Sequence, residues 1–201
     1  MSYGVTPIAV DLDVVRAALG SGDHALLSAV SHELRRRIDD LDRADDADAE
    51  DEDRAIPAAV ALRQMILGEP LSTSSVDSAK YGYMFEGVSQ HFGEGLPNSE
   101  WSGMGGDWFD SVDAALGAAG VAADRFRVVG SVFYRGMPVA IPAPDDFPAV
   151  GYVLRSEMPR VLAALRGIDL PDPEVGAAVE QIRSWLETCA GSGRDLVCFY
   201  Y

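Results

Sequence analysis

The last six residues, LVCFYY (Leu196–Tyr201), constrain the fold of this chain more than any other feature. All six are apolar or aromatic, without the polar–apolar alternation that marks a strand with one face in water. Such a run is typical of a strand that is covered on both faces. The sequence therefore predicts that this strand lies at the centre of a sheet. Tyr3–Val10, which is rich in strand formers, is its expected neighbour.

Helical patterns, with apolar residues at intervals of three and four, occupy most of the remaining chain. Helices are predicted from Asp11 or Asp13 to Gly20, from Asp23 to Leu41, from Ser156 to Leu165, and over Ile56–Leu67, Tyr81–Phe92, Asp107–Ala119 and Glu174–Ala190. Asp23 is the expected cap of its helix, and Gly68-Glu69-Pro70 is expected to end the helix over Ile56–Leu67. The serine-containing segment Leu71–Lys80 and the glycine-rich segment Gly93–Gly106 are predicted loops. Two strand-like pieces, Phe126–Tyr134 and Met137–Ile141, flank Arg135-Gly136 and predict a hairpin.

These elements predict an α+β fold in a single domain over residues 1–201. About six to seven helices are expected to pack on a small mixed sheet. That sheet would contain the N-terminal strand, the C-terminal strand and the hairpin at 126–141. A chain of 201 residues with 48% hydrophobic residues is long and apolar enough to bury such a core.

A concentrated run of acidic residues, Asp39–Asp53, interrupts this pattern. It carries ten acids and one arginine, and without it the net charge of the chain would be −7 instead of −16. Crowded like charges repel one another, which predicts a flexible loop over residues 42–55. The run has two interpretations: a solvated surface that maintains solubility, or an electrostatic attractant for a basic partner. The residues that would bind such a partner are Asp45, Asp46, Asp48, Glu50, Asp51, Glu52 and Asp53.

Composition also bears on the class of partner and on the compartment. The acidic balance argues against binding to nucleic acids and to anionic membranes, which attract basic proteins. No signal peptide or membrane-spanning segment is predicted. Two cysteines nine residues apart, Cys189 and Cys198, do not form a disulfide framework, so a cytoplasmic protein is expected. One lysine among 16 basic residues indicates the coding bias of a GC-rich genome.

Motifs for catalysis, metals and cofactors are weak. The histidines, His24, His32 and His91, form no HExxH motif, and the acidic run lacks the glycine of a calcium-binding loop. Cys189 lies at the C-terminal end of a predicted helix, where the dipole opposes a thiolate. The glycines of SGMGGDW (102–108) precede a helix without a phosphate-binding lysine. We therefore predict no catalytic residue, no metal site and no cofactor.

A group of aromatic and polar residues is the remaining candidate for a pocket. Tyrosine, tryptophan and arginine are enriched at binding hot spots, although most buried aromatic residues only fill a core. The pocket is expected between Gly93–Gly106 and Phe126–Tyr134. Its candidate residues are Tyr81, Tyr83, His91, Glu100, Trp101, Trp108, Tyr134 and Arg135.

The order of elements resembles the YfbM-like proteins, an uncharacterised bacterial family of α+β domains. The resemblance lies in IAVDLDVVRAAL, in ALRQMILGEPLS (61–72) and in the C-terminal WLETCAGSGRDLVCFYY. The segment YRGMPVAIPAPDDFPAVGY and the LVCFYY terminus are also similar to an actinobacterial family of unknown function. These resemblances imply an α+β fold and transfer no catalytic residue.

Two functional hypotheses follow. The first is a non-enzymatic cytosolic interaction domain, of the immunity or antitoxin kind, that binds a basic partner through the acidic run. The second is a small-molecule-binding domain or an unrecognised enzyme with a pocket near Trp101 and Arg135. A homodimer is compatible with either hypothesis.

Overall fold

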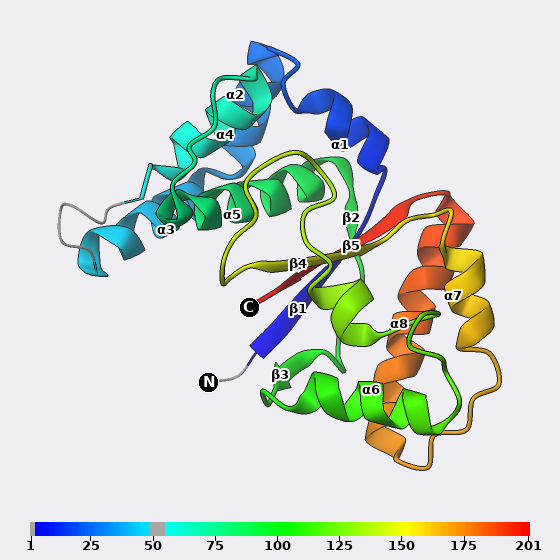
Figure 1. Ribbon diagram of the computed structural model, residues 1–201. Coiled ribbons are helices and arrows are strands. Elements are labelled where there is room, and N and C mark those ends of the chain that lie inside the picture. Colours follow the sequence, from blue (N-terminus) through cyan, green and yellow to red (C-terminus); the bar gives the residue numbers. More distant parts are fainter. Residues whose placement is uncertain (1–2, 49–54) are drawn as a thin grey trace. The chain divides into compact units, whose positions relative to one another are not determined.

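The fold is that of a computed structural model, which describes residues 3–48 and 55–201 (Figure 1). In these residues the chain forms eight α-helices, one π-helix and five strands. The predicted α+β class is confirmed. No helix among the described residues is long and apolar enough to cross a membrane.

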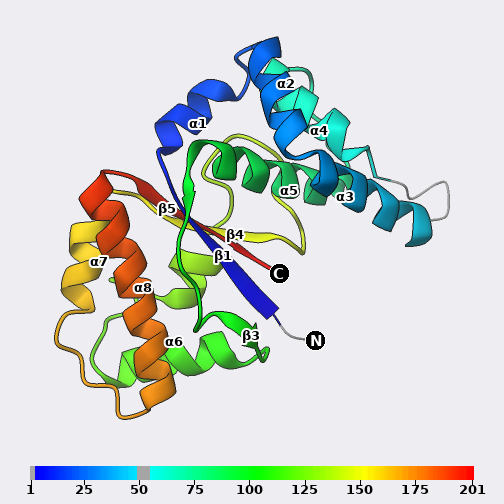
Figure 2. The same ribbon diagram turned by 180° about the vertical axis from the view of Figure 1, so that it is seen from behind.

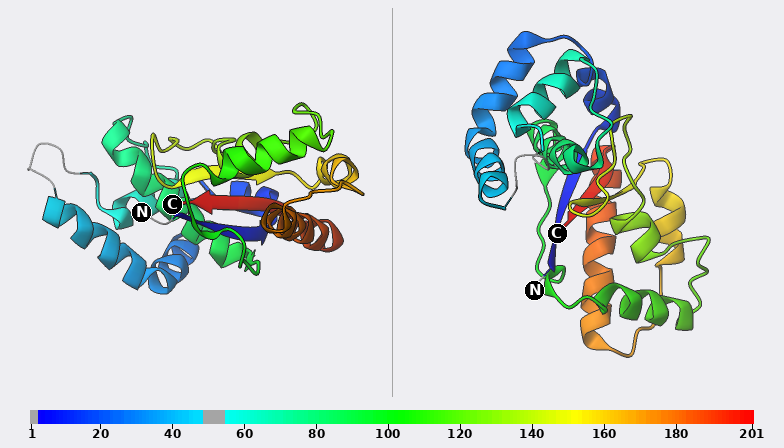
Figure 3. Two further views of the ribbon diagram at one scale, coloured as in Figure 1. Left: turned by 90° about the horizontal axis from the view of Figure 1, so that it is seen from below. Right: turned by 60° about the vertical axis from the view of Figure 1, so that its left-hand side comes forward.

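The sheet is built around the C-terminal strand β5 (Asp195–Tyr200). Its six residues are buried, and it pairs on one side with β1 (Tyr3–Val10) and on the other with β4 (Ala149–Val153). Figure 3 shows β1 and β5 running side by side. The prediction that the terminal strand is central and lies beside Tyr3–Val10 is confirmed.

The free edge of β1 carries two very short strands, β2 (Glu94–Gly95) and β3 (Ser102–Met104). β3 pairs with the start of β1 at Tyr3 and Gly4, and β2 pairs with its end at Ile8 and Ala9. Pro7, which has no backbone N–H to donate, lies between these two pairings. A proline is therefore tolerated inside a strand that has neighbours on both sides.

Contacts divide the chain into two compact units. Unit 1 comprises Met1–Asp11, Gly93–Pro138 and Ala149–Tyr201, and unit 2 comprises Leu12–Phe92 and Val139–Pro148. The expectation of one domain over residues 1–201 stays a prediction.

Unit 1 contains the sheet and the helices of the C-terminal half. Its helices are α6 (Trp108–Ala118), the π-helix η2 (Val128–Phe133), α7 (Met158–Ala164) and α8 (Pro173–Ser192). α8 contacts β1 and β5, and η2 contacts β4 and β5 (Figure 2). α8 begins after Asp172, whose carboxylate accepts the N–H groups of Glu174 and Val175, and it ends at the left-handed Gly193.

Unit 2 is helical. It contains α1 (Leu12–Ala18), α2 (His24–Glu33), α3 (Arg35–Asp48), α4 (Ala58–Leu67) and α5 (Ser75–Phe92). As predicted, Asp23 caps α2, accepting the N–H groups of Ala25 and Leu26 at 2.8 and 3.0 Å. The end of α4 at Gly68, in the left-handed conformation, was also predicted.

Two features of the predicted sheet are wrong. All its observed pairings are antiparallel, so the sheet is not mixed. The hairpin at 126–141 is absent, because Val128–Phe133 forms η2 and the segment 138–141 forms bends. The carboxylate of Asp113 accepts the N–H groups of Val128 and Val129 at 2.6 and 3.2 Å, which satisfies the first turn of η2. β4 supplies the strand that the hairpin was expected to provide.

Two predicted loops are partly helical. α5 begins at Ser75, inside the expected loop Leu71–Lys80. α3 continues to Asp48, so residues 42–48 of the expected acidic loop 42–55 are helical. Residues 49–54 lie outside the described residues.

Candidate functional site

The described part of the acidic run, residues 39–48, belongs to α3, a helix with little apolar surface. Ile38 is buried and Leu41 is half-buried, whereas Asp39 and Asp40 are exposed. Arg43 pairs with Asp40 at 2.8 Å, and both side chains are about 70% exposed, at 72% and 71%. Apolar packing of α3 is thus limited, and another interaction must hold it in place.

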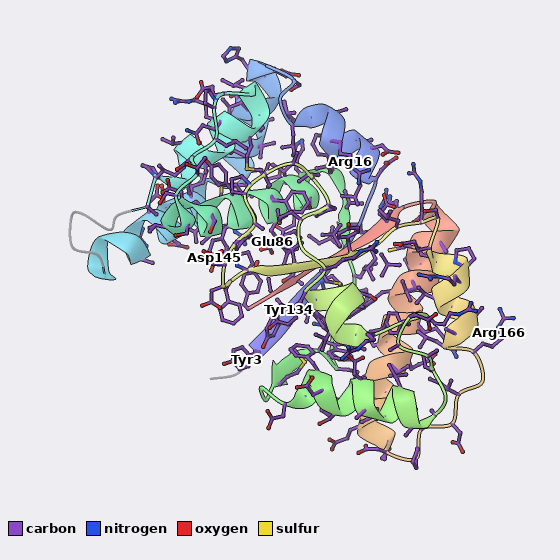
Figure 4. The ribbon with its side chains drawn as sticks, in the orientation of Figure 1. Tyr3, Arg16, Glu86, Tyr134, Asp145 and Arg166 are labelled. Atoms are coloured by element: carbon purple, nitrogen blue, oxygen red, sulfur yellow. The ribbon has the colours of Figure 1, made fainter. Side chains whose placement is uncertain are left out.

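Two buried charges on α5 supply that interaction. Lys80, 3% exposed, donates to the carbonyl oxygen of Leu41 at 2.9 Å and lies 3.6 Å from the carboxylate of Asp42. Glu86, 2% exposed, accepts a hydrogen bond from the guanidinium of Arg37 and another from Gln90. Burial raises the pKa of Glu86, and the bond from Arg37 opposes that shift. Glu86 is labelled on α5 in Figure 4.

Two aspartates hold the chain where it returns from the acidic run. Asp42, on α3, accepts the N–H of Ala58 at 2.7 Å, and Ala58 is the first residue of α4. Asp77, on α5, accepts the N–H of Ile56 at 2.7 Å. Side-chain hydrogen bonds therefore fix the chain at Asp42 and again at Ile56 and Ala58.

The single helix predicted from Asp23 to Leu41 is divided into α2 and α3, and α3 continues past the predicted end to Asp48. The anchoring explains this extension. Starting a helix is costly, whereas adding residues to a formed helix costs little. The turns that carry Arg37, Leu41 and Asp42 are already held by α5, so the helix propagates through the next residues despite their charge. Ala44 and Ala47 lie in this extension, and alanine has the highest helix propensity.

The predicted partner-binding residues fall partly on this extension. Asp45, Asp46 and Asp48 belong to the last turn of α3. Glu50, Asp51, Glu52 and Asp53 lie outside the described residues. Sequence reasoning found the acidic residues but missed the four residues that hold α3 and the start of α4 in place: Lys80, Asp42, Asp77 and Glu86. The available signal was the chain's one lysine, placed beside the apolar stripe of a helix.

The eight candidate pocket residues are divided between the two units. Tyr81, Tyr83 and His91 lie on α5, in unit 2. The Tyr81 hydroxyl donates to Gln64 and accepts the N–H of Ser72 at 2.7 Å. The guanidinium of Arg37 lies 5.8 Å from the centre of the Tyr83 ring. His91 contacts the carboxylate of Glu33 at 2.6 Å, which joins α5 to α2.

In unit 1, Trp101 and its neighbours form core. Trp101 is fully buried, stacks on Phe109 at 5.9 Å and lies 5.1 Å from Phe133. Its indole N–H donates to the carbonyl of Ala178 at 2.9 Å. Trp108 is half-buried, 6.3 Å from Trp101. Side chains therefore fill the space around Trp101.

Glu100 lies at the surface of unit 1. Its backbone N–H donates to the side chain of Gln181 at 2.7 Å, and its carboxylate accepts a hydrogen bond from Ser99 at 2.8 Å. These bonds hold the loop before β3 against α8. They assign Glu100 a structural role.

Tyr134 and Arg135 follow η2 directly and contact different residues. Arg135 binds Glu157 through two nitrogens at 2.6 and 2.9 Å and lies 4.2 Å above the Tyr152 ring. The hydrogen bond from Arg135 lowers the pKa of Glu157. The guanidinium is therefore occupied by groups of its own chain.

Tyr134 is 51% exposed and its ring meets that of Tyr200 edge-on at 5.7 Å. Tyr3 contacts the same ring at 5.5 Å; Tyr3 and Tyr134 are labelled in Figure 4. Burial, followed by the interaction with Tyr134, raises the pKa of Tyr200 to about 12. The rings of Tyr3 and Tyr134 thus cover the end of β5 at Tyr200.

The described residues offer little for chemistry. No group of three or more histidine, cysteine or acidic side chains in residues 3–48 and 55–201 could hold a metal ion. Both cysteines are free and buried. Burial raises the pKa of Cys189 to about 12 and that of Cys198 well above its usual value, so both thiols stay protonated at neutral pH.

Comparison with known proteins places the chain in a family. A family model described as a domain of unknown function (DUF7691) matches residues 1–201. The chain belongs to this family. No curated protein matches the chain, and no solved structure matches it. The match covers both units and the acidic run.

Proposed function

We propose that this DUF7691 protein is a non-enzymatic interaction domain, of the immunity or antitoxin kind, that binds a basic partner protein through Asp39–Asp53. The observation that carries the proposal is the anchoring of α3. Buried Lys80 and Glu86 hold Leu41 and Arg37 of α3, a helix in which ten of the fourteen residues are charged. A charged segment held at both ends loses less conformational freedom on binding than a free one.

The charge of the segment supports the same function. Ten acids in fifteen residues produce a strong local negative potential, which accelerates the approach of a basic surface. Such attraction weakens as salt is added, because the screening length falls to about 10 Å at 0.1 M. A partner bound in this way is expected to dissociate at high salt.

We further infer a cytoplasmic setting in a bacterial cell. Two free, buried cysteines and no disulfide among the described residues agree with a reducing compartment. Kinship with the YfbM-like and actinobacterial families, and a homodimer, stay predictions. Light scattering on the purified protein tests the homodimer.

The alternative, a small-molecule site near Trp101 and Arg135, has less support. Trp101 is enclosed by aromatic side chains, and the guanidinium of Arg135 is bound by Glu157. Opening a site there would break these contacts. We therefore do not propose an enzymatic function.

The test compares two variants of equal net charge. In the first, Asp45, Asp46, Asp48, Glu50, Asp51, Glu52 and Asp53 are changed to their amides. In the control, seven exposed acids elsewhere are changed to amides: Asp110, Asp124, Asp145, Asp146, Glu174, Glu180 and Glu187. Partners are captured from a lysate of the source organism at low salt. Their affinity for each variant is then measured over a series of salt concentrations.

The first variant is expected to lose most of the affinity and its salt dependence, whereas the control retains both. Equal binding by the two variants would contradict the proposal, because net charge alone would then account for the attraction.

A further inference from the structure

A small hollow lies in unit 1 at the C-terminal end of α6. Ala115, Ala118 and Ala119 form one wall, and Leu170 and Val175 belong to the other. Figures 1 and 2 both show the segment between α7 and α8 passing this end of α6. The cavity measures about 230 Å³. Sites for drug-sized ligands start at roughly 300 Å³, so this hollow suits a single side chain.

One acidic side chain on the rim of the hollow, that of Asp169, makes no polar interaction with the described residues of the chain. Asp169 lines the hollow and is exposed, and its carboxylate has no hydrogen bond or ion pair with any residue that the structure describes. Asp172, also on the rim, caps α8 by accepting the N–H groups of Glu174 and Val175 at 2.9 and 3.3 Å. Asp169 is thus the carboxylate that remains for a ligand.

The end of α6 adds a second preference for positive charge. The C-terminus of a helix carries a partial negative charge, and a cation near it is stabilised by about 0.3–1 kcal/mol. The last turn of α6 contains no basic residue that would satisfy this preference. The C-terminal end of α6 and the carboxylate of Asp169 therefore both favour a positively charged group in the hollow.

We propose that this hollow binds the side chain of a lysine from a basic partner protein. Its methylene groups would lie against the alanines and Val175, and its ammonium group would bind Asp169. Lysine combines an apolar stem with a compact charge that has three donors, whereas arginine needs a wider, planar site. The inference rests on the proposed function, which supplies the basic partner. It adds a contact with that partner outside the acidic run.

The experiment uses the full chain and a lysine model compound. Nα-acetyl-lysine-N-methylamide is titrated into the protein while methyl signals of Ala118, Ala119 and Val175 are followed by NMR. The norleucine analogue, which has a similar stem without the ammonium group, is the matched ligand. Saturable shifts of these three methyl signals are expected with the lysine compound, and markedly weaker shifts with the norleucine compound.

Two variants test the assignment of roles. Asp169→Asn removes the carboxylate and should weaken binding about fivefold, as expected for an exposed ion pair. Ala118→Leu fills the hollow and should abolish the shifts of Ala119 and Val175. Asp124→Asn, at an exposed aspartate outside the hollow, is the control and should bind like the unaltered protein.

Three results would overturn the inference: no shift with the lysine compound, equal shifts with the norleucine compound, or unchanged affinity in Asp169→Asn. These results are separable from a failure of the proposed function. The variant with a neutralised acidic run keeps the hollow and should still bind the lysine compound. Its behaviour over the salt series with captured partners tests only the acidic run.

Discussion

At the scale of single residues, the pair of Arg135 and Glu157 shows how η2 is held to the start of α7. Glu157 accepts two hydrogen bonds from the guanidinium and a third from the N–H of Leu154 at 3.0 Å. Two parallel bonds between a guanidinium and a carboxylate are stronger than a single-point pair. The pair is partly exposed, so its contribution stays near the upper end of the range for surface pairs.

The pH dependence of this pair is a testable consequence. Because the hydrogen bond from Arg135 lowers the pKa of Glu157 in the folded state, the pair stabilises the fold above the unfolded pKa, about 4.3. This stabilisation is lost as the pH falls through the folded pKa. Glu157→Gln should lower the free energy of unfolding by about 1 kcal/mol at pH 7. The difference from the unaltered protein should vanish in strong acid.

Urea denaturation at several pH values measures this difference. Glu187→Gln is a suitable control, since Glu187 is 60% exposed and its contact with Arg183 is 3.5 Å long. A difference for Glu157→Gln that persists unchanged in strong acid would contradict the assigned role of the ion pair.

Sequence reasoning succeeded at residues whose role is local. Asp23 as a helix cap and Gly68 as a helix end follow from backbone chemistry within a few positions. Lys80 and Glu86 could not be found in this way, because their partners lie 39 and 49 residues away. A buried charge is tolerated only with its partner in place, and that partner is set by tertiary packing.

At the scale of elements, the packing of η2 against β4 explains why the predicted hairpin fails. Gly151, in the middle of β4, allows the backbone of η2 to approach, since a Cβ atom at this position would overlap the carbonyl of Val132. The sequence Phe126–Tyr134 has strand-forming residues, but the N–H groups of Val128 and Val129 are bound by Asp113. A tertiary hydrogen bond here outweighs intrinsic strand propensity.

Gly151→Ala is therefore expected to destabilise the fold by about 1–3 kcal/mol, the usual cost of overpacking a core. The clash is with backbone atoms, which cannot move aside as a side chain can. Gly130→Ala is the matched control within η2, because a Cβ atom there meets nothing within 4 Å. Thermal unfolding of both variants checks the prediction, and equal melting temperatures would contradict the close approach of η2 and β4.

The anchoring of α3 yields a second prediction for an element. Asp42→Ala removes the acceptor for the N–H of Ala58 and the carboxylate nearest Lys80, and should cost about 1–2 kcal/mol. Asp39→Ala, at an exposed aspartate on the same helix, should change stability by no more than about 0.5 kcal/mol. Chemical denaturation measures both. If the two variants lose equal stability, Asp42 does not anchor the helix.

At the scale of the whole molecule, the sequence predicted the class of fold and the central pair of strands. The apolar run of β5 needed cover on both faces, and this requirement alone placed it between other strands. The short strands β2, β3 and β4 were missed, since two to five residues carry too little periodicity to be recognised. The acidic run was recognised from charge alone, but its helical part depends on contacts with α5.

The whole-molecule charge leads to the last prediction. Changing the seven acids from Asp45 to Asp53 to amides reduces the net charge from −16 to −9 and with it the self-repulsion of the folded chain. The anchors at Asp42, Asp77, Lys80 and Glu86 are untouched, so the packing of unit 2 should persist. The melting temperature is therefore expected to stay the same or rise slightly at low salt. Any rise should disappear at high salt, because screening already suppresses the repulsion there.

The variant with seven exposed acids changed elsewhere has the same net charge but keeps the acidic run, so its melting temperature should rise less. A large fall in melting temperature for the first variant would show that the acidic side chains themselves support the fold.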